Sequence, residues 1–186
     1  MSGRSFCPLK EQSALVIVDF QDAILNTFAP PIIKQLKKQA ALTIRMAQQF
    51  SLPIVVMEQY PKGLGGTNEE IRALLGDDYR PFAKKIFSGW SVIGDRVAEL
   101  GRNHLLIMGI ETHICVLQTA VDLLDQGYSL FVLKDAVGSR YTYDWKTGCS
   151  LIERAGGIIT SVQTVLFHFL EKAEGPDFKA MLPYLK

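Results

Sequence analysis

Short apolar runs alternate along the chain with longer segments in which apolar residues recur every three or four positions. The short runs are rich in β-branched residues, and the clearest are residues 14–19 (ALVIVD), 53–57 (PIVVM), 105–110 (LLIMGI), 129–133 (SLFVL) and 157–161 (GIITS). Their continuous apolar character predicts strands that are buried on both faces, as in a parallel sheet.

The segments between these runs show the period of amphipathic helices. Residues 32–50 place Ile33, Leu36, Ala40 and Ile44 at three- and four-residue steps. Further helices are predicted at residues 95–100, 113–126, 144–155 and 164–172. Strands that alternate with helices predict an α/β fold in which helices cover both faces of a mostly parallel sheet.

Length and composition favour one folded domain. The chain has 186 residues, of which 48% are hydrophobic and 21% are charged, a balance typical of globular proteins. We therefore expect residues 1–186 to form a single domain, with residues 1–12 as an N-terminal arm. The loop at residues 60–67 (YPKGLGGT) holds the densest cluster of turn residues, and we expect it to be a mobile flap.

The charge pattern argues against nucleic-acid and membrane partners. The net charge is +1, and the 20 basic and 19 acidic residues are spread over both halves without a basic stripe. The apolar runs are too short to cross a bilayer, and the N-terminus lacks the apolar run of a signal peptide. These features predict a cytoplasmic protein that acts on a small-molecule substrate.

Cysteine and histidine spacing does not support a metal site or a disulfide framework. Cys7, Cys115 and Cys149 lie far apart without a CxxC pair, and the three histidines show no ligand spacing such as HExxH. We expect no metal ion and no cofactor, which leaves thiol chemistry. Cys149 in a predicted helix and Cys7 in the arm are interpreted as structural.

Asp19 ends the first predicted strand and is a candidate proton acceptor. Ligands bind at the carboxyl ends of strands in open α/β sheets. A carboxylate directly after five apolar residues is partly desolvated, which raises its pKa and suits a base. A turn aspartate or a helix cap is the competing interpretation.

Cys115 is a candidate nucleophile in the first turn of the helix that follows residues 105–110. There the helix dipole and the unpaired N–H groups favour the thiolate. Glu111 or Thr112 is a candidate cap, and the tight turn directs backbone N–H groups to one place, as an oxyanion hole requires. Gly109 relieves crowding at the bend. A buried core cysteine is the alternative.

Lys84 and His113 carry weaker signals. Lys84 belongs to a lysine pair in PFAKKIFSGW, and such pairs are usually solvated, but its apolar and aromatic neighbours favour a site role. His113 lies two residues before Cys115, so on a helix the two side chains do not face each other. We assign His113 to capping or to pocket polarity.

Three motifs resemble those of the isochorismatase-like cysteine hydrolases, a superfamily that includes nicotinamidases and N-carbamoylsarcosine amidohydrolases. LVIVDFQDAIL carries Asp19, KKIFSGW carries Lys84 and GIETHICVLQTA carries Cys115, in the order and spacing of the family. The segments DAVGSR and GGIITSVQTVLF resemble later parts of the family pattern. The resemblance runs from about Ser13 to the C-terminus.

The resemblance implies a Rossmann-like three-layer α/β/α sandwich with a cis peptide bond between Ile110 and Glu111. It also implies a triad of Asp19, Lys84 and Cys115, with the backbone N–H groups of Glu111 and Cys115 as the oxyanion hole. Asp19 would accept the thiol proton, Lys84 would stabilise the charged pair, and the thiolate would attack a carboxamide-like carbonyl to form a thioester. Family members often form dimers or larger rings, so we expect a homo-oligomer, with the apolar tail VLFHFLEKAEGPDFKAMLPYLK as a contact surface.

The chain departs from the metal-binding nicotinamidases after the second strand. Those enzymes carry an aspartate and histidines there, whereas this chain has EQYP, which argues against nicotinamide, zinc and iron. The pocket is then expected to be apolar and aromatic, with a lining of Phe20, Phe28, Tyr60, Trp90 and Ile110. Core packing is an equally plausible role for each of these residues.

Two other functions stay open. Isochorismate hydrolysis cleaves a vinyl ether, but enzymes assigned to it typically lack the nucleophilic cysteine and bind a dicarboxylate, for which paired arginines or lysines are expected. A family member kept as a binding protein, with its thiol unused, is the third candidate. The presence of Cys115 and of the complete triad favours hydrolysis of a C–N bond in a small amide-type substrate.

Overall fold

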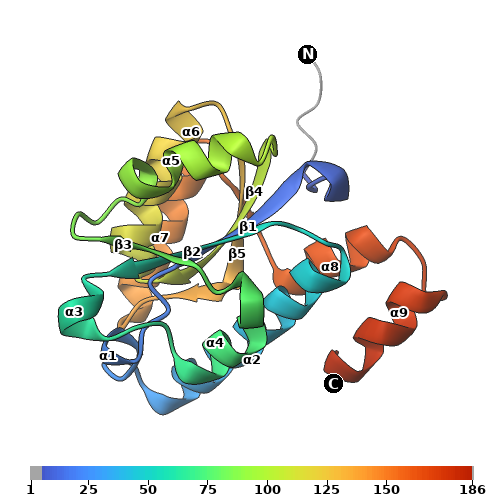
Figure 1. The fold of residues 1–186 in the computed structure, drawn as a ribbon, viewed down its shortest axis with the longest axis horizontal. Helices are drawn as coiled ribbons and strands as arrows, with labels where there is room; N and C mark the ends of the chain where they lie inside the picture. Colours follow the sequence, from blue (N-terminus) through green and yellow to red (C-terminus); the bar gives the residue numbers. More distant parts are fainter. Residues whose placement is uncertain (1–5, 186) are drawn as a thin grey trace.

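The computed structural model describes residues 6–185, and a six-stranded sheet lies at its centre (Figure 1). The strands are β1 (Ser13–Val18), β2 (Ile54–Gln59), β3 (Pro81–Lys84), β4 (His104–Ile110), β5 (Ser129–Gly138) and β6 (Ile158–Thr160). Their spatial order is β3-β2-β1-β4-β5-β6, and every neighbouring pair is parallel. The prediction of a mostly parallel sheet is confirmed.

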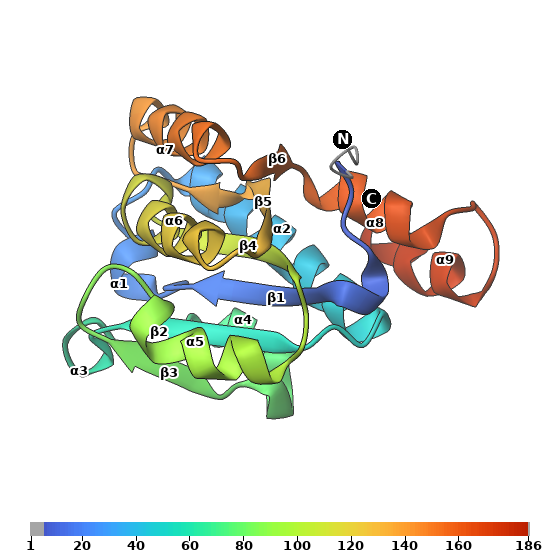
Figure 2. The same ribbon diagram turned by 90° about the horizontal axis from the view of Figure 1, so that it is seen from above.

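Helices cover both faces of the sheet, so the molecule has three layers (Figure 2). One face carries α2 (Pro30–Gln49), α4 (Glu69–Leu75), α8 (Val162–Leu170) and α9 (Pro176–Met181), and the other carries α5 (Trp90–Glu99), α6 (Leu117–Asp125) and α7 (Thr142–Arg154). Shorter turns are η1 (Lys10–Gln12), α1 (Asp22–Leu25), α3 (Pro61–Leu64), η2 (Gly76–Asp78) and η4 (Leu182–Tyr184). The Rossmann-like α/β/α sandwich is confirmed.

The central strand β1 explains the continuous apolar runs of the sequence. Each residue of β1 is buried. Leu15 and Ile17 belong to the apolar core on the α2 face, whereas Val16 and Val18 belong to the core on the α5 and α6 face. Because alternate side chains of a strand point to opposite faces, a strand covered on both sides needs an apolar residue at every position.

Gly109 lets β4 approach β1 closely just before the turn that carries Cys115. Its φ is +132°, and a Cβ atom at this position would lie 2.0 Å from the carbonyl oxygen of Val18. A side chain cannot fit there, so the predicted role of Gly109 in relieving crowding is confirmed.

Some elements differ from the sequence predictions. The apolar pattern did not predict β3, because only Lys84 among its four residues is buried. The helix α5 begins at Trp90 rather than at residue 95, and β5 continues to Gly138, past its predicted end at residue 133. The helix predicted at residues 113–126 begins as a π-helical turn, η3 (Thr112–Val116).

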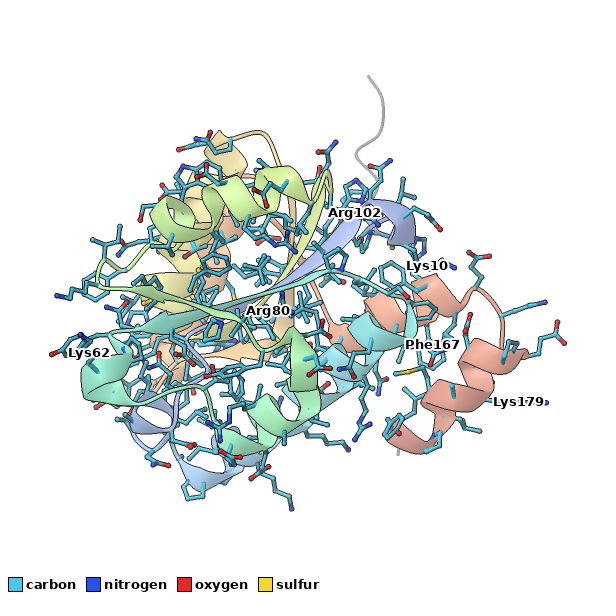
Figure 3. All side chains as sticks on the ribbon, in the orientation of Figure 1. Lys10, Lys62, Arg80, Arg102, Phe167 and Lys179 are labelled. Carbon is cyan, nitrogen blue, oxygen red and sulfur yellow. The ribbon has the colours of Figure 1, made fainter. Side chains whose placement is uncertain are left out.

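Part of the predicted N-terminal arm is attached to the rest of the structure, and residues 1–5 of the arm lie outside the described residues. The N–H of Leu9 donates to His104 Nδ1 at 2.9 Å. Lys10 Nζ donates to the carbonyl of Phe169 at 2.9 Å, and Figure 3 shows Lys10 on the side of the molecule where α8 lies. This part of the arm is therefore hydrogen-bonded to both β4 and α8.

The apolar tail that was expected to form a contact surface is only partly buried in the core. Val165, Leu166 and Phe169 of α8 are buried on the α2 face, and so is Met181 of α9. Phe167 is 48% exposed. Leu182 and Tyr184 are 45% and 40% exposed, so the tail also keeps apolar side chains that are available for contacts with another chain.

No helix within residues 6–185 combines the length and the apolar character that a bilayer crossing requires. The longest helix, α2, is amphipathic and packs its apolar side chains on the sheet. Its exposed side is polar, as expected for a surface helix.

Candidate active site

The three candidate catalytic residues meet at the carboxyl ends of the strands. Asp19 follows β1, Lys84 ends β3, and Cys115 lies in η3 after β4. Because β2 separates β3 from β1, Lys84 reaches Asp19 across the end of β2. Lys84 Nζ lies 2.7 Å from Asp19 Oδ2, and both side chains are fully buried.

The ammonium group of Lys84 has an acceptor for each of its three hydrogens. Besides Asp19 Oδ2, Nζ lies 2.7 Å from Gln59 Oε1 and 2.9 Å from the carbonyl oxygen of Phe87. A cation paired in this way is held in one position and has no N–H left for a ligand. Lys84 is therefore a support for Asp19, and the solvated lysine pair is excluded as an interpretation of this residue.

Gln59 and Gln21 position Lys84, and sequence reasoning missed both. Gln59 is the register partner of Lys84, and its Nε2 donates to the carbonyl of Lys85 at 2.8 Å, which directs Oε1 toward Nζ. Gln21 accepts the N–H of Gln59 at 2.7 Å and donates to its carbonyl at 2.9 Å. The available signal was a glutamine at the end of β2 and another just after β1.

Glu58 holds the loop at residues 60–67, which was predicted to be a mobile flap. Glu58 Oε1 accepts hydrogen bonds from the Thr67 N–H at 2.7 Å, from the Thr67 hydroxyl at 2.8 Å and from the Tyr79 hydroxyl at 2.6 Å. The loop also contains α3, and Gln21 donates to the carbonyl of Gly65 at 2.6 Å. The structure thus ties this segment to the ends of β1 and β2.

Burial raises the pKa of the Asp19 carboxyl, as the sequence predicted, and the charge and hydrogen bond of Lys84 oppose this effect. Oδ2 binds Lys84, whereas Oδ1 is buried and has no hydrogen-bond partner among the described residues. Asp19 also has a left-handed backbone conformation, with φ of 50°, which residues other than glycine seldom adopt. A raised pKa and an unpartnered oxygen equip this carboxylate to accept a proton.

The thiol of Cys115 is protonated at neutral pH in the resting protein. Burial, followed by the charge of Asp19, raises the pKa of Cys115 to about 12, and the charge of Lys84 acts in the opposite direction. The expectation that the helix start favours the thiolate is therefore wrong for this state, because burial and the charge of Asp19 raise the pKa of the thiol. Cys115 needs a base before it can act as a nucleophile.

The turn that carries Cys115 is held by backbone contacts. The peptide bond between Ile110 and Glu111 is cis. The carbonyl of Glu111 accepts the N–H groups of Ile114 at 3.1 Å and Val116 at 3.2 Å, which flank Cys115. These bonds fix the position of Cys115 relative to the end of β4.

Neither predicted cap residue caps this turn. The side chain of Glu111 makes no capping hydrogen bond; its Oε2 instead accepts the N–H of Arg140 at 2.8 Å. The hydroxyl of Thr112 is buried and has no partner among the described residues. Glu111 therefore links the turn to the segment after β5.

The residues predicted to line the pocket fall into two groups. Phe20, Phe28 and Ile110 are buried in the apolar core on the α2 face, where packing alone accounts for them. Trp90 is half-buried at the start of α5, and Tyr60 is 47% exposed. Only Trp90 and Tyr60 have surface available for a substrate.

Two exposed apolar residues near Lys84 were not predicted. Ile86 and Phe87 are 55% and 53% exposed, although the carbonyl of Phe87 is bound to Lys84. Large apolar side chains that are exposed beside a buried polar cluster are suited to contact an apolar ligand or another chain. Both residues lie in the loop that follows β3, and the sequence pattern did not predict β3.

The remaining cysteine and histidine candidates have surroundings that differ from those of Asp19, Lys84 and Cys115. Cys149 is a free thiol in α7, and burial raises its pKa. His113 contacts Ser139 and Asp144. Within residues 6–185, no three or more histidine, cysteine, aspartate or glutamate side chains form a group that could hold a metal ion.

Comparisons with known proteins identify the family. The model of the isochorismatase domain matches residues 13–164. The secreted isochorismatase effector Isc1 of Phytophthora sojae is 34% identical over 184 residues, which cover 96% of this chain and 86% of that protein.

Solved structures share the fold. The MAR1 ribonuclease of Caenorhabditis elegans has a TM-score of 0.88 and 29% identity, with 96% of this chain and 92% of that chain covered. The YcaC gene product of Escherichia coli is described as an octameric hydrolase of unknown specificity. It has a TM-score of 0.86 and 21% identity, with 98% of this chain and 95% of that chain covered. At 21% identity the likeness concerns the fold alone.

Proposed function

The chain belongs to the isochorismatase family of hydrolases, and on that premise we propose that it hydrolyses the C–N bond of a small amide-type substrate through a thioester on Cys115. The observation that carries the proposal is the buried carboxylate of Asp19. Its Oδ1 has no partner among the described residues, and its charge acts on the thiol of Cys115. Lys84 holds the other oxygen and completes the proposed triad.

In the first step, Asp19 Oδ1 takes the thiol proton while the sulfur attacks the carbonyl carbon of the amide. Lys84 stays bound to Oδ2 and stabilises the negative charge that the pair shares during the transfer. The proposed donors to the resulting oxyanion are the backbone N–H groups of Glu111 and Cys115.

In the second step, the C–N bond breaks and the protonated Asp19 gives its proton to the departing ammonia or amine. Asp19 then takes a proton from water as the water oxygen attacks the thioester carbon. The C–S bond breaks, a carboxylic acid leaves, and Asp19 returns the proton to Cys115. One carboxyl thus serves as base and as acid in turn, and a raised pKa suits both roles.

We propose that the substrate is uncharged at its reacting end. Lys84 uses its three hydrogens on Asp19, Gln59 and Phe87, so it offers no donor to a substrate carboxylate. This pairing argues against the vinyl ether reaction, whose substrate is a dicarboxylate. The half-buried Trp90 and the exposed Tyr60 are the proposed apolar contacts.

The same pairing argues against a phosphodiester substrate. The relative from Caenorhabditis elegans is named as a ribonuclease. RNA binding relies on cationic side chains that contact phosphates, whereas the cation of this site is already paired and the net charge of the chain is +1. RNA is therefore a comparison substrate in the experiment below.

We also propose that the protein is a cytoplasmic homo-oligomer. The fold neighbour from Escherichia coli is described as octameric, and Ile86, Phe87 and Phe167 are exposed apolar side chains that could form contacts. The relative from Phytophthora sojae is named as secreted. Light scattering on the purified protein and fractionation of the source cells test these points, and a monomer or a protein in the medium would contradict them.

Ammonia release from a panel of small primary amides tests the proposed activity. Cys115→Ala is expected to abolish release. Cys149→Ala is the matched control, because the two thiols are 6% and 5% exposed, and it is expected to retain full activity. Release that persists without Cys115 contradicts the thioester mechanism.

The other functions have their own outcomes in the same assay series. Pyruvate from isochorismate, without ammonia from any amide, supports vinyl ether hydrolysis. Cleavage of RNA that depends on Cys115 supports a ribonuclease. An inactive protein in all three assays supports a binding member of the family.

A further inference from the structure

A second cluster of catalytic residue types lies beside the turn that carries Cys115. His113 of η3 contacts both Ser139, which follows β5, and Asp144 in the first turn of α7. We propose that Ser139 is a second nucleophile, activated by His113 and Asp144, which hydrolyses small esters in the neighbouring cavity without the aid of Cys115.

The cluster has the order of a serine, its base and a carboxylate, with the carboxylate placed to act on the imidazole by its charge. The Ser139 hydroxyl lies 3.0 Å from His113 Nδ1, and His113 Nε2 lies 3.8 Å from Asp144 Oδ2. With its proton on Nε2, the neutral imidazole accepts the serine proton at Nδ1. Asp144 then stabilises the imidazolium from the opposite side of the ring.

Two glycine positions, Gly138 and Gly148, allow the fold to bring these three side chains together. Gly138 pairs with Ile110 between β5 and β4, so Ser139 follows directly at the level of the turn. Gly148 brings α7 against the same turn, since a Cβ there would lie 2.9 Å from the backbone nitrogen of His113. The three side chains therefore sit on elements that pack tightly, as a catalytic group requires.

Ser139 opens into a cavity of about 210 Å³. Its lining combines the apolar side chains of Ile32, Leu36, Val137 and Trp145 with the polar side chains of Gln35, Lys134, Asp135 and Thr142. Ser139 itself is 3% exposed, so its hydroxyl is shielded from bulk water. A cavity of this size with mainly apolar walls suits the short acyl chain of a small ester.

The reaction conserves atoms and electrons. Ser139 Oγ attacks the ester carbonyl carbon while its proton moves to His113 Nδ1, the C–O bond to the leaving group breaks, and His113 protonates the departing alcohol. Water then gives a proton to His113 as its oxygen attacks the acyl carbon, the bond from that carbon to Ser139 Oγ breaks, and His113 returns the proton to Oγ. The products are a carboxylic acid, an alcohol and the restored serine, with no other reactant consumed.

The proposal goes beyond the amide hydrolysis assigned to Cys115 and can be tested in its absence. In Cys115→Ala protein, diisopropyl fluorophosphate is expected to modify Ser139, as located by peptide mass spectrometry. Hydrolysis of p-nitrophenyl acetate by the same protein is expected to fall at least about a hundredfold in Ser139→Ala and about tenfold in Asp144→Asn.

Ser150→Ala is the control, because Ser150 is an exposed serine of α7, the helix that carries Asp144, and it is expected to change neither result. Circular dichroism confirms that each variant is folded. If Ser139→Ala does not fold, the labelled residue in the Cys115→Ala protein and the effect of Asp144→Asn still decide the question. No label on Ser139, or ester hydrolysis that Asp144→Asn leaves unchanged, overturns the proposal.

Discussion

Two aspartates that follow apolar runs, Asp19 buried just after β1 and Asp135 half-buried within β5, have similar sequence settings and different partners. Asp19 follows the apolar run of β1, and Asp135 follows that of β5. Burial is the largest cause that raises the pKa of each carboxyl. Asp19 binds Lys84 at 2.7 Å, whereas Asp135 Oδ1 accepts the N–H of Val162, the first residue of α8, at 2.9 Å.

The difference teaches that burial alone does not make a carboxylate a catalytic base. One carboxylate oxygen of Asp135 accepts a hydrogen bond from the first residue of α8, which is a structural role. Asp19 has an oxygen without a partner, a cation that supports the other oxygen, and a thiol that responds to its charge. These partners come from strands and turns that lie far apart in the sequence.

The largest expected difference between the two aspartates is in turnover. Asp19→Asn keeps the size of the side chain but cannot take a proton from Cys115, so kcat/KM for an amide should fall by about a thousandfold. Asp135→Asn should leave kcat/KM unchanged within about twofold, because the carboxyl of Asp135 binds the start of α8 and not Cys115. Steady-state kinetics on both variants test this contrast, and equal losses would refute it.

The next largest effect is on stability and concerns the lysine. Lys84→Met leaves the carboxylate of Asp19 buried without its cation, which should cost about 3 kcal/mol of folding free energy at pH 8. Lys134→Met is the control near the other aspartate; Lys134 is exposed, and its loss should cost less than about 0.5 kcal/mol.

The cost of Lys84→Met should depend on pH. Lys84 lowers the pKa of Asp19, so its removal raises the folded-state pKa further above the unfolded value. The folded protein then holds a proton that the unfolded chain has lost, and stability falls as pH rises from about 4 through the folded-state pKa. Urea unfolding at pH 5 and pH 8 should show the smaller cost at pH 5, and equal costs would contradict the account.

A smaller effect is expected for Gln59, which has no counterpart beside Asp135. Gln59→Met removes the amide oxygen that accepts a hydrogen bond from the charged Lys84. The free energy of unfolding should therefore fall by about 2 kcal/mol and turnover should fall about tenfold. Gln118→Met, at an exposed position of α6, serves as the control. Chemical denaturation and amide kinetics provide the measurements; a Gln59 variant that behaves like the Gln118 variant would show that Lys84 needs no positioning.

The smallest expected effect concerns the helix start at Asp135. Asp135→Ala removes the acceptor for the Val162 N–H and should cost about 1 kcal/mol. Asp135→Asn retains an acceptor and removes a charge that burial disfavours, so at pH 8 it should be at least as stable as the parent protein. Thermal unfolding distinguishes the two variants, and equal losses would contradict the assigned role.

The parts of the fold that the sequence predicted are those with a strong local pattern. β1 and β4 were located to within one residue because they are apolar on both faces. β3 was missed because its one buried residue is Lys84, so neither alternation nor an apolar run marks it. The π-helical turn of η3 gave no periodic signal that separates it from the start of an ordinary helix.

The candidate site was predictable where a residue type and a strand end coincide, as for Asp19 and Cys115. The supporting glutamines were not, because Gln21 and Gln59 matter only through contacts between segments that are distant in sequence. The pKa direction of Cys115 was also missed, since burial and the charge of a neighbour outweigh the local helix start.

The most direct test of the central claim is the mass of the protein during turnover of an amide, measured after a rapid acid quench. A nucleophilic Cys115 predicts a mass increase equal to the acyl group of the substrate, located on the peptide that contains Cys115 and absent from Cys115→Ala. An actively turning-over protein with no adduct, or with the adduct on another residue, would contradict the assignment of Cys115 as the nucleophile.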